Sequence, residues 1–429
     1  MKKRCVAMLL TAAVLLAGCG SSGSEAADSA DTTATAQEET SEQTDAAGAA
    51  EEADGSEAAG AEEADGSEAA NAEEADGSEE TTDDSAISDS EDLTYADYAD
   101  DEPYITTDDS GDMPVSVGEL FAMDTYMKIT CYGEHAEEAV TAAAQEIRRL
   151  DALLSVGNPD SEVNAINEHG SGSVSEETMT MLKQALEAYE TTGGAFDITI
   201  YPLMVEWGFT SGDFRVPDQT SIDALLKLVD SSELVLDEEK ATLTLGEGQG
   251  IDLGGIAKGF TSDRLMELFE EYDVVAAVIS LGGNVQCYRT KPDGSLWRCG
   301  IIDPNYPDDE SNLMCVVELD GQAAITSGAY ERNFTDPDTG VLYHHILDPS
   351  TGYSANSGLT SVTVISEKGI LADTLSTALY VMGLDAALEY WQEYGDDFDL
   401  VLMTEDDRVY VTGGMKDRIT SDYPIVVVE

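Results

Sequence analysis

Basic residues are scarce in this chain. Its 429 residues include only 20 Lys and Arg against 88 Asp and Glu, which gives a formal net charge of −68 at pH 7. Proteins that hold nucleic acid or anionic lipid directly do so with clustered Lys and Arg, because these side chains neutralise phosphates. The acidic excess therefore argues against a nucleic-acid partner and against direct adhesion to an anionic membrane surface.

Histidine and cysteine are also rare. There are four histidines and six cysteines, and the cysteine spacings match no metal-ligand pattern such as C-x-x-C. Two of the cysteines lie in the N-terminal segment, and the others are Cys131, Cys287, Cys299 and Cys315. A Cys287–Cys299 disulfide and buried free thiols are both open from the sequence, since an exported domain of this size tolerates either.

The apolar run at the N-terminus is short. A basic start precedes it, it ends near Leu16, and it is too short to span a bilayer as a mature helix. The tetrapeptide Leu16-Ala17-Gly18-Cys19 resembles the lipobox of bacterial lipoproteins; an ordinary secretory signal is the alternative. The lipobox implies that residues 1–18 are a signal peptide and that a fatty acid such as palmitate acylates Cys19. It predicts a protein lipid-anchored at the extracytoplasmic face of the cell membrane.

The next segment almost lacks bulky apolar side chains. Residues 20–112 contain 32 acidic residues and no Lys or Arg, and a unit beginning EEADGSE starts at Glu51, Glu62 and Glu73. Such a composition cannot bury enough apolar surface to offset the entropy of folding. We therefore expect residues 19–112 to form a disordered, self-repelling acidic tether.

Residues 113–429 have the composition of one globular domain. Helical and strand patterns interleave there without a regular βαβ rhythm, which predicts an α+β fold with a mixed sheet. Helices are expected at 135–154, 175–191 and 370–382, with another that runs to about Tyr272. Strands are expected at 127–131, 274–281, 313–319, 359–365 and 400–403.

Two glycine-containing segments are candidates for ligand binding. Gly193-Gly194-Ala195-Phe196-Asp197 precedes Tyr201 and Trp207, so backbone that allows close approach is followed by flat apolar side chains; a helix end followed by core aromatics is the alternative. Asp252–Gly259, with Lys258, reads as a strand, a glycine turn and a helix N-terminus. Such an arrangement attracts anions, although a generic glycine-rich turn fits equally.

Two further segments carry candidate catalytic groups. The first runs from Thr326 to Arg332 and is followed by His344 and His345. Adjacent strand residues face opposite ways, so one of the two histidines is expected to act as a general base. The second holds Asp373 and Thr377 at i and i+4 of a helix, oxygen ligands suited to Mg²⁺. For the histidine segment, the alternative is a surface hairpin without a catalytic role. For Asp373 and Thr377, the alternative is an acid that interacts with the helix dipole and a hydroxyl that bonds back to the helix.

Together, and in this order, these segments resemble the ApbE family of FAD:protein FMN transferases, also called thiamine-biosynthesis lipoproteins. The resemblance covers essentially residues 116–425. The motifs that carry it are GAFD, DLGGIAKG, GGN, TSG-x-Y-E-R, HHILDP-x-TGY and AD-x-x-x-T, which begin at Gly194, Asp252, Gly282, Thr326, His344 and Ala372.

The resemblance implies binding of FAD and Mg²⁺, transfer of FMN to a Ser or Thr hydroxyl of an acceptor protein, and release of AMP. It implies that His345 is the base that deprotonates this hydroxyl. It assigns magnesium to the carbonyl of Gly255 and the side chains of Asp373 and Thr377. It assigns FAD to Met123, Ala195, Phe196, Asp197, Asp252, Lys258 and the backbone near Leu347.

The acceptor implied by the family is a membrane redox-complex subunit or an extracytoplasmic flavoprotein. One departure is Met123-Asp124-Thr125, where many members have Met-Gly-Thr; the added carboxylate would alter how FAD is held. Two other functions fit the same residues. One is a Mg²⁺-dependent FAD pyrophosphatase that uses water in place of the hydroxyl, and the other is a flavin-binding lipoprotein without catalysis.

Overall fold

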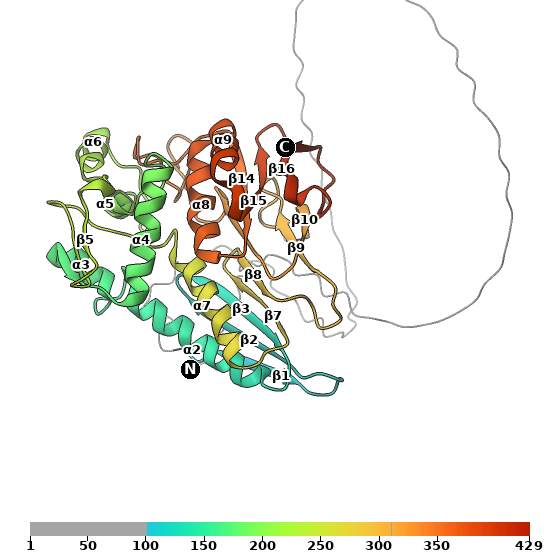
Figure 1. The fold of residues 1–429 in the computed structure, drawn as a ribbon. Helices are drawn as coiled ribbons and strands as arrows, with labels where there is room; N and C mark the ends of the chain where they lie inside the picture. The colour runs from blue at the N-terminus through green and yellow to red at the C-terminus, as the bar shows by residue number, and fades with distance from the viewer. Residues whose placement is uncertain (1–100, 310) are drawn as a thin grey trace, which may run out of the picture. The chain divides into compact units, whose positions relative to one another are not determined.

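The computed structural model describes residues 101–309 and 311–429 (Figure 1). The predicted signal peptide, the lipidated Cys19 and the tether up to residue 100 lie outside the described residues. Within the described part of the chain, no helix is both long and apolar enough to cross a membrane.

A ten-stranded sheet organises the domain. Nearly all neighbouring strands are antiparallel, but β16 and β18 are parallel, so the sheet is mixed and the fold is α+β, as predicted. Its strand order is β1 (Tyr104–Asp108), β2 (Val115–Ala122), β3 (Thr125–Tyr132), β7 (Ala276–Leu281), β8 (Asn284–Tyr288), β11 (Ala323–Gly328), β14 (Leu359–Ser366), β15 (Phe398–Thr404), β16 (Val409–Thr412) and β18 (Ile425–Val428).

The two faces of this sheet are covered differently, because successive strand residues point to opposite sides. In β7, Ile279 packs with the apolar faces of two helices, whereas Val278 packs towards a smaller three-stranded sheet. The helices on the first face are α2 (Ala136–Leu154), α7 (Ala257–Glu271), α8 (Gly369–Met382) and α9 (Leu384–Tyr394). The smaller sheet comprises β9 (Trp297–Ile302), β10 (Leu313–Leu319) and β17 (Ile419–Thr420).

The segment between α2 and α7 builds a separate helical layer (green in Figure 1). Its core is formed by apolar residues such as Ile166, Met181 and Leu243. The layer contains α3 (Glu162–His169), β4 (Ser171–Ser173), α4 (Glu176–Thr191), α5 (Tyr201–Trp207), α6 (Gln219–Leu225), β5 (Val235–Asp237) and β6 (Thr242–Thr244). At its edge, the ring of Trp207 packs against that of Tyr343 in a tilted arrangement, with ring centroids 4.9 Å apart. This contact holds the hairpin of β12 (Asn333–Thr335) and β13 (Leu342–His344).

The predicted elements agree with the structure to within a few residues. The expected helices correspond to α2, α4, α7 and α8, and the expected strands to β3, β7, β10, β14 and β15. The four cysteines at 131, 287, 299 and 315 are buried and free, so Cys287 and Cys299 form no disulfide. Burial raises the pKa of each of these thiols, which makes them unreactive.

The tether boundary at residue 112 is wrong. Tyr104–Asp108 form β1, which pairs with β2 along five residues from Tyr104↔Glu119 to Asp108↔Val115. Ile105 also packs against the apolar cluster beneath α2. The acidic residues on both sides of this segment make its composition resemble that of the disordered tether. The segment nevertheless forms a strand, because it can pair with the free edge of β2 and bury one apolar side chain.

Removing β1 is expected to destabilise the domain modestly. A chain that begins at residue 113 loses the β1–β2 hydrogen bonds and the contact of Ile105. Its melting temperature should fall by a few degrees relative to a chain that begins at residue 101, since each kcal/mol shifts Tm by about 2–4 °C in domains of this size class. Differential scanning calorimetry of the two chains measures the shift. Equal melting temperatures would mean that β1 contributes nothing.

Candidate active site

Two tight turns lie side by side at one end of the main sheet. Met123 and Asp124 connect β2 to β3 with φ of 49° and 58°, and Gly282 and Gly283 connect β7 to β8 with φ of 55° and 87°. Two positive φ values are the signature of a type I′ hairpin turn. The strands β3 and β7 pair up to Met127↔Leu281. A Cβ on Gly282 would lie 2.1 Å from Thr125 Oγ1, so glycine is required there.

Glu331 and Arg332 reach these turns from the segment after β11. A Cβ on Gly283 would lie 2.9 Å from Glu331 Oε1, and the Arg332 guanidinium lies 3.5 Å from the Asp124 carboxylate. Burial raises the pKa of Glu331 to about 7, and Asp373 adds to this while Lys258 and Arg332 oppose it. No sequence pattern by itself predicts a role for Glu331. The charged pair at the end of the TSG-x-Y-E-R motif was the signal that could have found it.

His345 lies against the same segment. Its backbone N–H donates to the carbonyl of Arg332 at 3.0 Å, and its Nδ1 is 3.3 Å from that oxygen. Burial lowers the pKa of His345 to about 3, and the nearby Arg332, His344 and Lys258 lower it further. The imidazole is therefore neutral at pH 7 and able to accept a proton.

His344 makes entirely different contacts. Its Nε2 lies 3.0 Å from the carbonyl oxygen of Ala355, and its ring meets that of Tyr380 edge-on at 5.7 Å. The two histidines thus have different partners, although β13 ends at His344 and His345 lies beyond the strand, so strand alternation is not the reason. Of the two, His345 is the one whose charge environment includes Lys258 and Arg332.

Lys258 stands in the first turn of α7 without a partner. Among the described residues it makes no ion pair or hydrogen bond, although it acts electrostatically on Asp252, Glu331 and His345. Asp252 is fixed in the preceding loop, where its Oδ1 accepts the N–H of Gly254 at 2.7 Å. Burial raises the pKa of Asp252. A helix N-terminus with an unpaired lysine suits a phosphate group.

Asp373, Thr377 and Gly255 converge between α7 and α8. Asp373 Oδ2 accepts the N–H of Gly259 at 2.7 Å, and a Cβ on Gly255 would lie 3.7 Å from Thr377 Oγ1. Gly259 itself permits this approach, because a Cβ there would meet the Gly369 carbonyl oxygen at 2.3 Å. The helices α7 and α8 therefore cross closely enough to join residues more than a hundred positions apart.

These three residues fit Mg²⁺ by their chemistry. They offer a carboxylate, a hydroxyl and a carbonyl, which are the hard oxygen donors that Mg²⁺ prefers. Asp373 is only 4% exposed, yet among the described residues no Lys, Arg or His forms an ion pair with it. A buried carboxylate in that situation favours a bound cation. Groups of three or more His, Cys, Asp or Glu that could hold a metal are absent from residues 101–309 and 311–429, so these mixed oxygen donors are the metal candidate.

The residues expected to contact FAD differ in their roles. A Cβ on Gly255 would lie 3.1 Å from the ring of Phe196, so the segment of Ala195 and Phe196 borders the metal candidate. Met123 Sδ is 3.8 Å from Thr261 Oγ1 on α7. Leu347 is buried in a cluster with Trp207 and Phe209, and it pairs with Ser354 through an isolated β-bridge.

The side chain of Asp197 has a structural function. It accepts four hydrogen bonds, from the N–H and hydroxyl of Thr199 and from the N–H and hydroxyl of Ser231, at 2.6–3.1 Å. Its carboxylate therefore holds the loop after Phe196 in place. Three of these bonds go to Oδ1 and only one goes to Oδ2, so Oδ2 keeps acceptor capacity.

Known proteins of similar sequence and fold indicate what the chain is related to. The model of the ApbE family matches residues 123–402. An FAD:protein FMN transferase of Klebsiella pneumoniae is 31% identical over 300 residues, which is 68% of this chain and 91% of the relative. Another from Treponema pallidum is 29% identical over 319 residues, with 69% and 86% covered. The crystal structure of an ApbE protein from Thermotoga maritima superimposes with a TM-score of 0.62 at 32% identity, covering 71% of this chain and 95% of the other.

Proposed function

Because the chain belongs to the ApbE family and is an FAD:protein FMN transferase, we propose that the residues around Lys258, His345 and Asp373 carry out the transfer with Mg²⁺. The observation that supports this most is the convergence of an unpaired lysine, a neutral histidine and an ion-pair-free carboxylate at the N-terminal end of α7. These are the groups needed to hold a diphosphate, accept a proton and bind a cation.

The reaction exchanges the phosphoanhydride bond of FAD for a phosphoester bond to the acceptor. The oxygen of an acceptor Ser or Thr hydroxyl attacks the phosphorus on the FMN side of the FAD diphosphate. The bond from this phosphorus to the bridging oxygen breaks, and AMP leaves with that oxygen. The hydroxyl proton passes to Nε2 of His345, whose Nδ1 lies beside the Arg332 carbonyl.

Each neighbouring residue then has a definable task. Lys258 and the positive end of the α7 helix dipole bind the diphosphate and stabilise the charge that develops on it. Asp373, Thr377 and the carbonyl of Gly255 would hold Mg²⁺, which when bound neutralises the phosphate oxygens. Arg332 keeps the His345 segment in register through its carbonyl oxygen.

The setting of the reaction is a further part of the proposal. The lipobox around Cys19 supports a lipoprotein anchored at the extracytoplasmic face of the membrane. The acidic segment that follows would let the domain reach acceptors at that surface. The acceptor would accordingly be a membrane redox-complex subunit or an exported flavoprotein.

One incubation separates this function from its two alternatives. The purified protein is mixed with FAD and Mg²⁺, with and without an acceptor flavoprotein, and the products are followed by mass spectrometry. Transfer predicts an acceptor heavier by FMN together with free AMP. Free FMN and AMP, with an unlabelled acceptor, would indicate a pyrophosphatase, and intact FAD would indicate a binding protein.

Replacing Asp124 by Gly is expected to tighten FAD binding. The substitution removes a carboxylate beside the proposed phosphate site and releases Arg332 from its ion pair. Gly also adopts the φ of 58° without strain. A half-exposed ion pair contributes up to about 1 kcal/mol, so the dissociation constant for FAD should fall by up to about fivefold. Quenching of flavin fluorescence measures this constant.

The matched control is Asp273→Gly. Asp273 is also exposed and has a positive φ of 51°, but it follows α7 at the end away from Lys258. Its replacement should leave FAD affinity unchanged. Equal affinities in Asp124→Gly and the unaltered protein would mean that the Asp124 carboxylate does not compete with FAD.

A further inference from the structure

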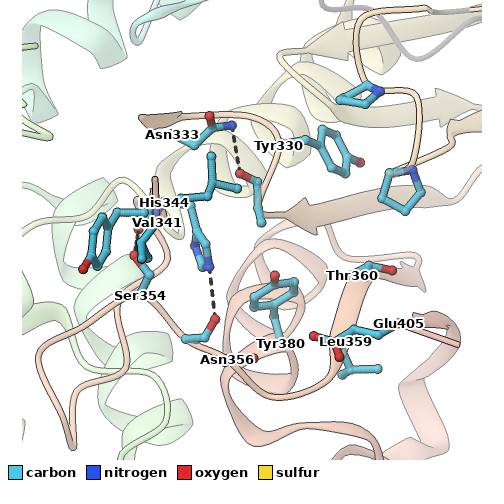
Figure 2. A pocket seen from close by; sticks show the side chains of 16 residues that line it. Tyr330, Asn333, Val341, His344, Ser354, Asn356, Leu359, Thr360, Tyr380 and Glu405 are labelled. Carbon is cyan, nitrogen blue, oxygen red and sulfur yellow. Dashed lines mark hydrogen bonds between the residues drawn. The ribbon is translucent and has the colours of Figure 1, made fainter. Parts of the chain in front are cut away.

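A pocket lies beside the histidine segment, against residues that the transfer chemistry does not use. It has a volume of about 600 Å³ and is bounded by the β12–β13 hairpin, by Tyr330 and Tyr380, and by the segment around Asn356 (Figure 2). This volume is within the range of ligand sites in proteins. We propose that this pocket receives an extended polypeptide segment of the acceptor protein, next to the Ser or Thr that becomes flavinylated. The inference rests on the proposed transfer to an acceptor hydroxyl.

The pocket and the reaction site share two stretches of chain. His344 lines the pocket and His345 follows it in the sequence; Asn333 lines the pocket and Arg332 precedes it. Asn333 and His344 are directly opposed in the hairpin, and His345 N–H binds the Arg332 carbonyl at 3.0 Å. On both stretches, the residue that lines the pocket is the immediate neighbour in the chain of a residue of the reaction site.

His344 presents an unmet hydrogen-bonding group at this pocket. Its Nε2 must donate to the Ala355 carbonyl, which can only accept, so the neutral ring carries a lone pair on Nδ1. This Nδ1 is buried without a partner among the described residues, and the side chain is only 6% exposed. A buried acceptor without a donor is costly. An occupant with an N–H or O–H group, such as a peptide, satisfies it once a small shift of the ring uncovers Nδ1.

The charge of the lining argues against the diphosphate of FAD. Among the residues that the structure describes, the lining contains one charged residue, Glu405, and no Lys or Arg. Phosphates are held by cations and by free N–H groups, neither of which this lining supplies as side chains. The phosphate-binding groups Lys258 and α7 belong to the adjoining reaction site, so the pocket is suited to a neutral or basic partner.

The rim of the pocket is apolar and exposed. Val341 and Leu342 line it and are 46% and 49% exposed. These two neighbouring apolar side chains offer a partner protein apolar surface to bury. The wall behind them is packed, because the ring of Tyr343 contacts those of Trp207 and Phe334. A preformed wall of this kind lowers the entropy lost when a flexible segment binds.

The experiment uses the full chain with FAD, Mg²⁺ and a library of short peptides, each with one central threonine. Labelling by FMN is read by mass spectrometry, and FAD affinity is measured separately. Val341→Glu should raise KM for the preferred peptides by about tenfold, as expected for a lost apolar anchor, with kcat and FAD affinity unchanged. It should also shift the preference at one position near the threonine towards Lys or Arg.

Two further variants complete the test. Val235→Glu makes the same change at an exposed valine of β5 and should leave KM unchanged. His344→Phe removes the Nδ1 acceptor and should also raise KM for peptides. If His344→Phe does not fold, Val341→Glu still tests whether the pocket binds the peptide, because Val341 is exposed and its replacement should not impair folding.

Three outcomes would overturn the inference. The first is equal KM values in Val341→Glu and Val235→Glu. The second is a loss of FAD affinity in Val341→Glu, which would mean that the pocket binds one end of FAD rather than the acceptor. The third is an unaltered protein that labels none of the peptides, because the inference requires a short segment to suffice. Labelling of a whole acceptor flavoprotein in a parallel sample tells whether the transferase function itself has failed.

Discussion

Replacing Asp373 by Ala is expected to abolish Mg²⁺-dependent FMN transfer. Asp373 is the one carboxylate among the three proposed ligands, and it supplies the negative charge that makes the site selective for a cation. A metal that stabilises phosphoryl transfer contributes several kcal/mol to the barrier, so the rate should fall by roughly 10³-fold or more. Transfer to an acceptor and Mg²⁺ binding by calorimetry are both measured, and both should be lost.

Two companion variants separate metal binding from folding. Asp373→Ala also leaves the buried N–H of Gly259 without its acceptor, whereas Asp373→Asn keeps an oxygen for that bond and removes only the charge. Asp263→Asn changes another buried carboxyl group, one that caps α8 through the N–H groups of Gly369 and Ile370. The Asp263 variant should bind Mg²⁺ normally even if it is less stable. Normal transfer by Asp373→Asn in the presence of a chelator would refute the metal assignment.

Replacing His345 by Asn should preserve binding and remove most of the turnover. The neutral imidazole is the proposed proton acceptor for the attacking hydroxyl, and general-base catalysis contributes ~10²–10⁴-fold. Burial and nearby cations hold the pKa of His345 at about 3 in the free domain. The negative charge of a bound diphosphate raises this pKa, which makes the histidine a stronger base once FAD is present. Single-turnover transfer measures the loss, with FAD and Mg²⁺ affinities as controls.

His344→Asn is the matched comparison. His344 binds the Ala355 carbonyl and faces Tyr380, so its replacement should retain kcat and raise KM for the acceptor. Similar losses of kcat in both variants would indicate that the hairpin, rather than one imidazole, had been disturbed. Near-normal kcat in both would exclude a histidine base and would make Glu331, with its pKa of about 7, the next candidate.

Local patterns in the sequence determined much of this protein. The amphipathic periods of α2 and α4 depend on residues three and four positions apart, and the strand patterns on alternate residues, so both can be read without the fold. The same is true of Asp373 and Thr377, which share one face of α8. Six ordered motifs were enough to indicate the family, which the comparisons then confirmed.

Contacts between distant segments could be decided only by the tertiary structure. The bond from Gly259 to Asp373 and the ion pair between Asp124 and Arg332 join residues more than a hundred positions apart. No periodicity encodes such contacts. Asp197 is an example: the hydrogen bonds that its carboxylate accepts from Thr199 and Ser231 could not be read from its motif.

The sequence by itself therefore determined the fold class, the family and the residue types available for chemistry. Packing decided what those residues do, because desolvation and neighbouring charge exist only once the chain is folded. Burial is the largest influence on the pKa values of Glu331 and His345, and it leaves His344 with an unmatched acceptor. Likewise, the composition of the segment that contains β1 predicts disorder, but pairing with the free edge of β2 makes it a strand.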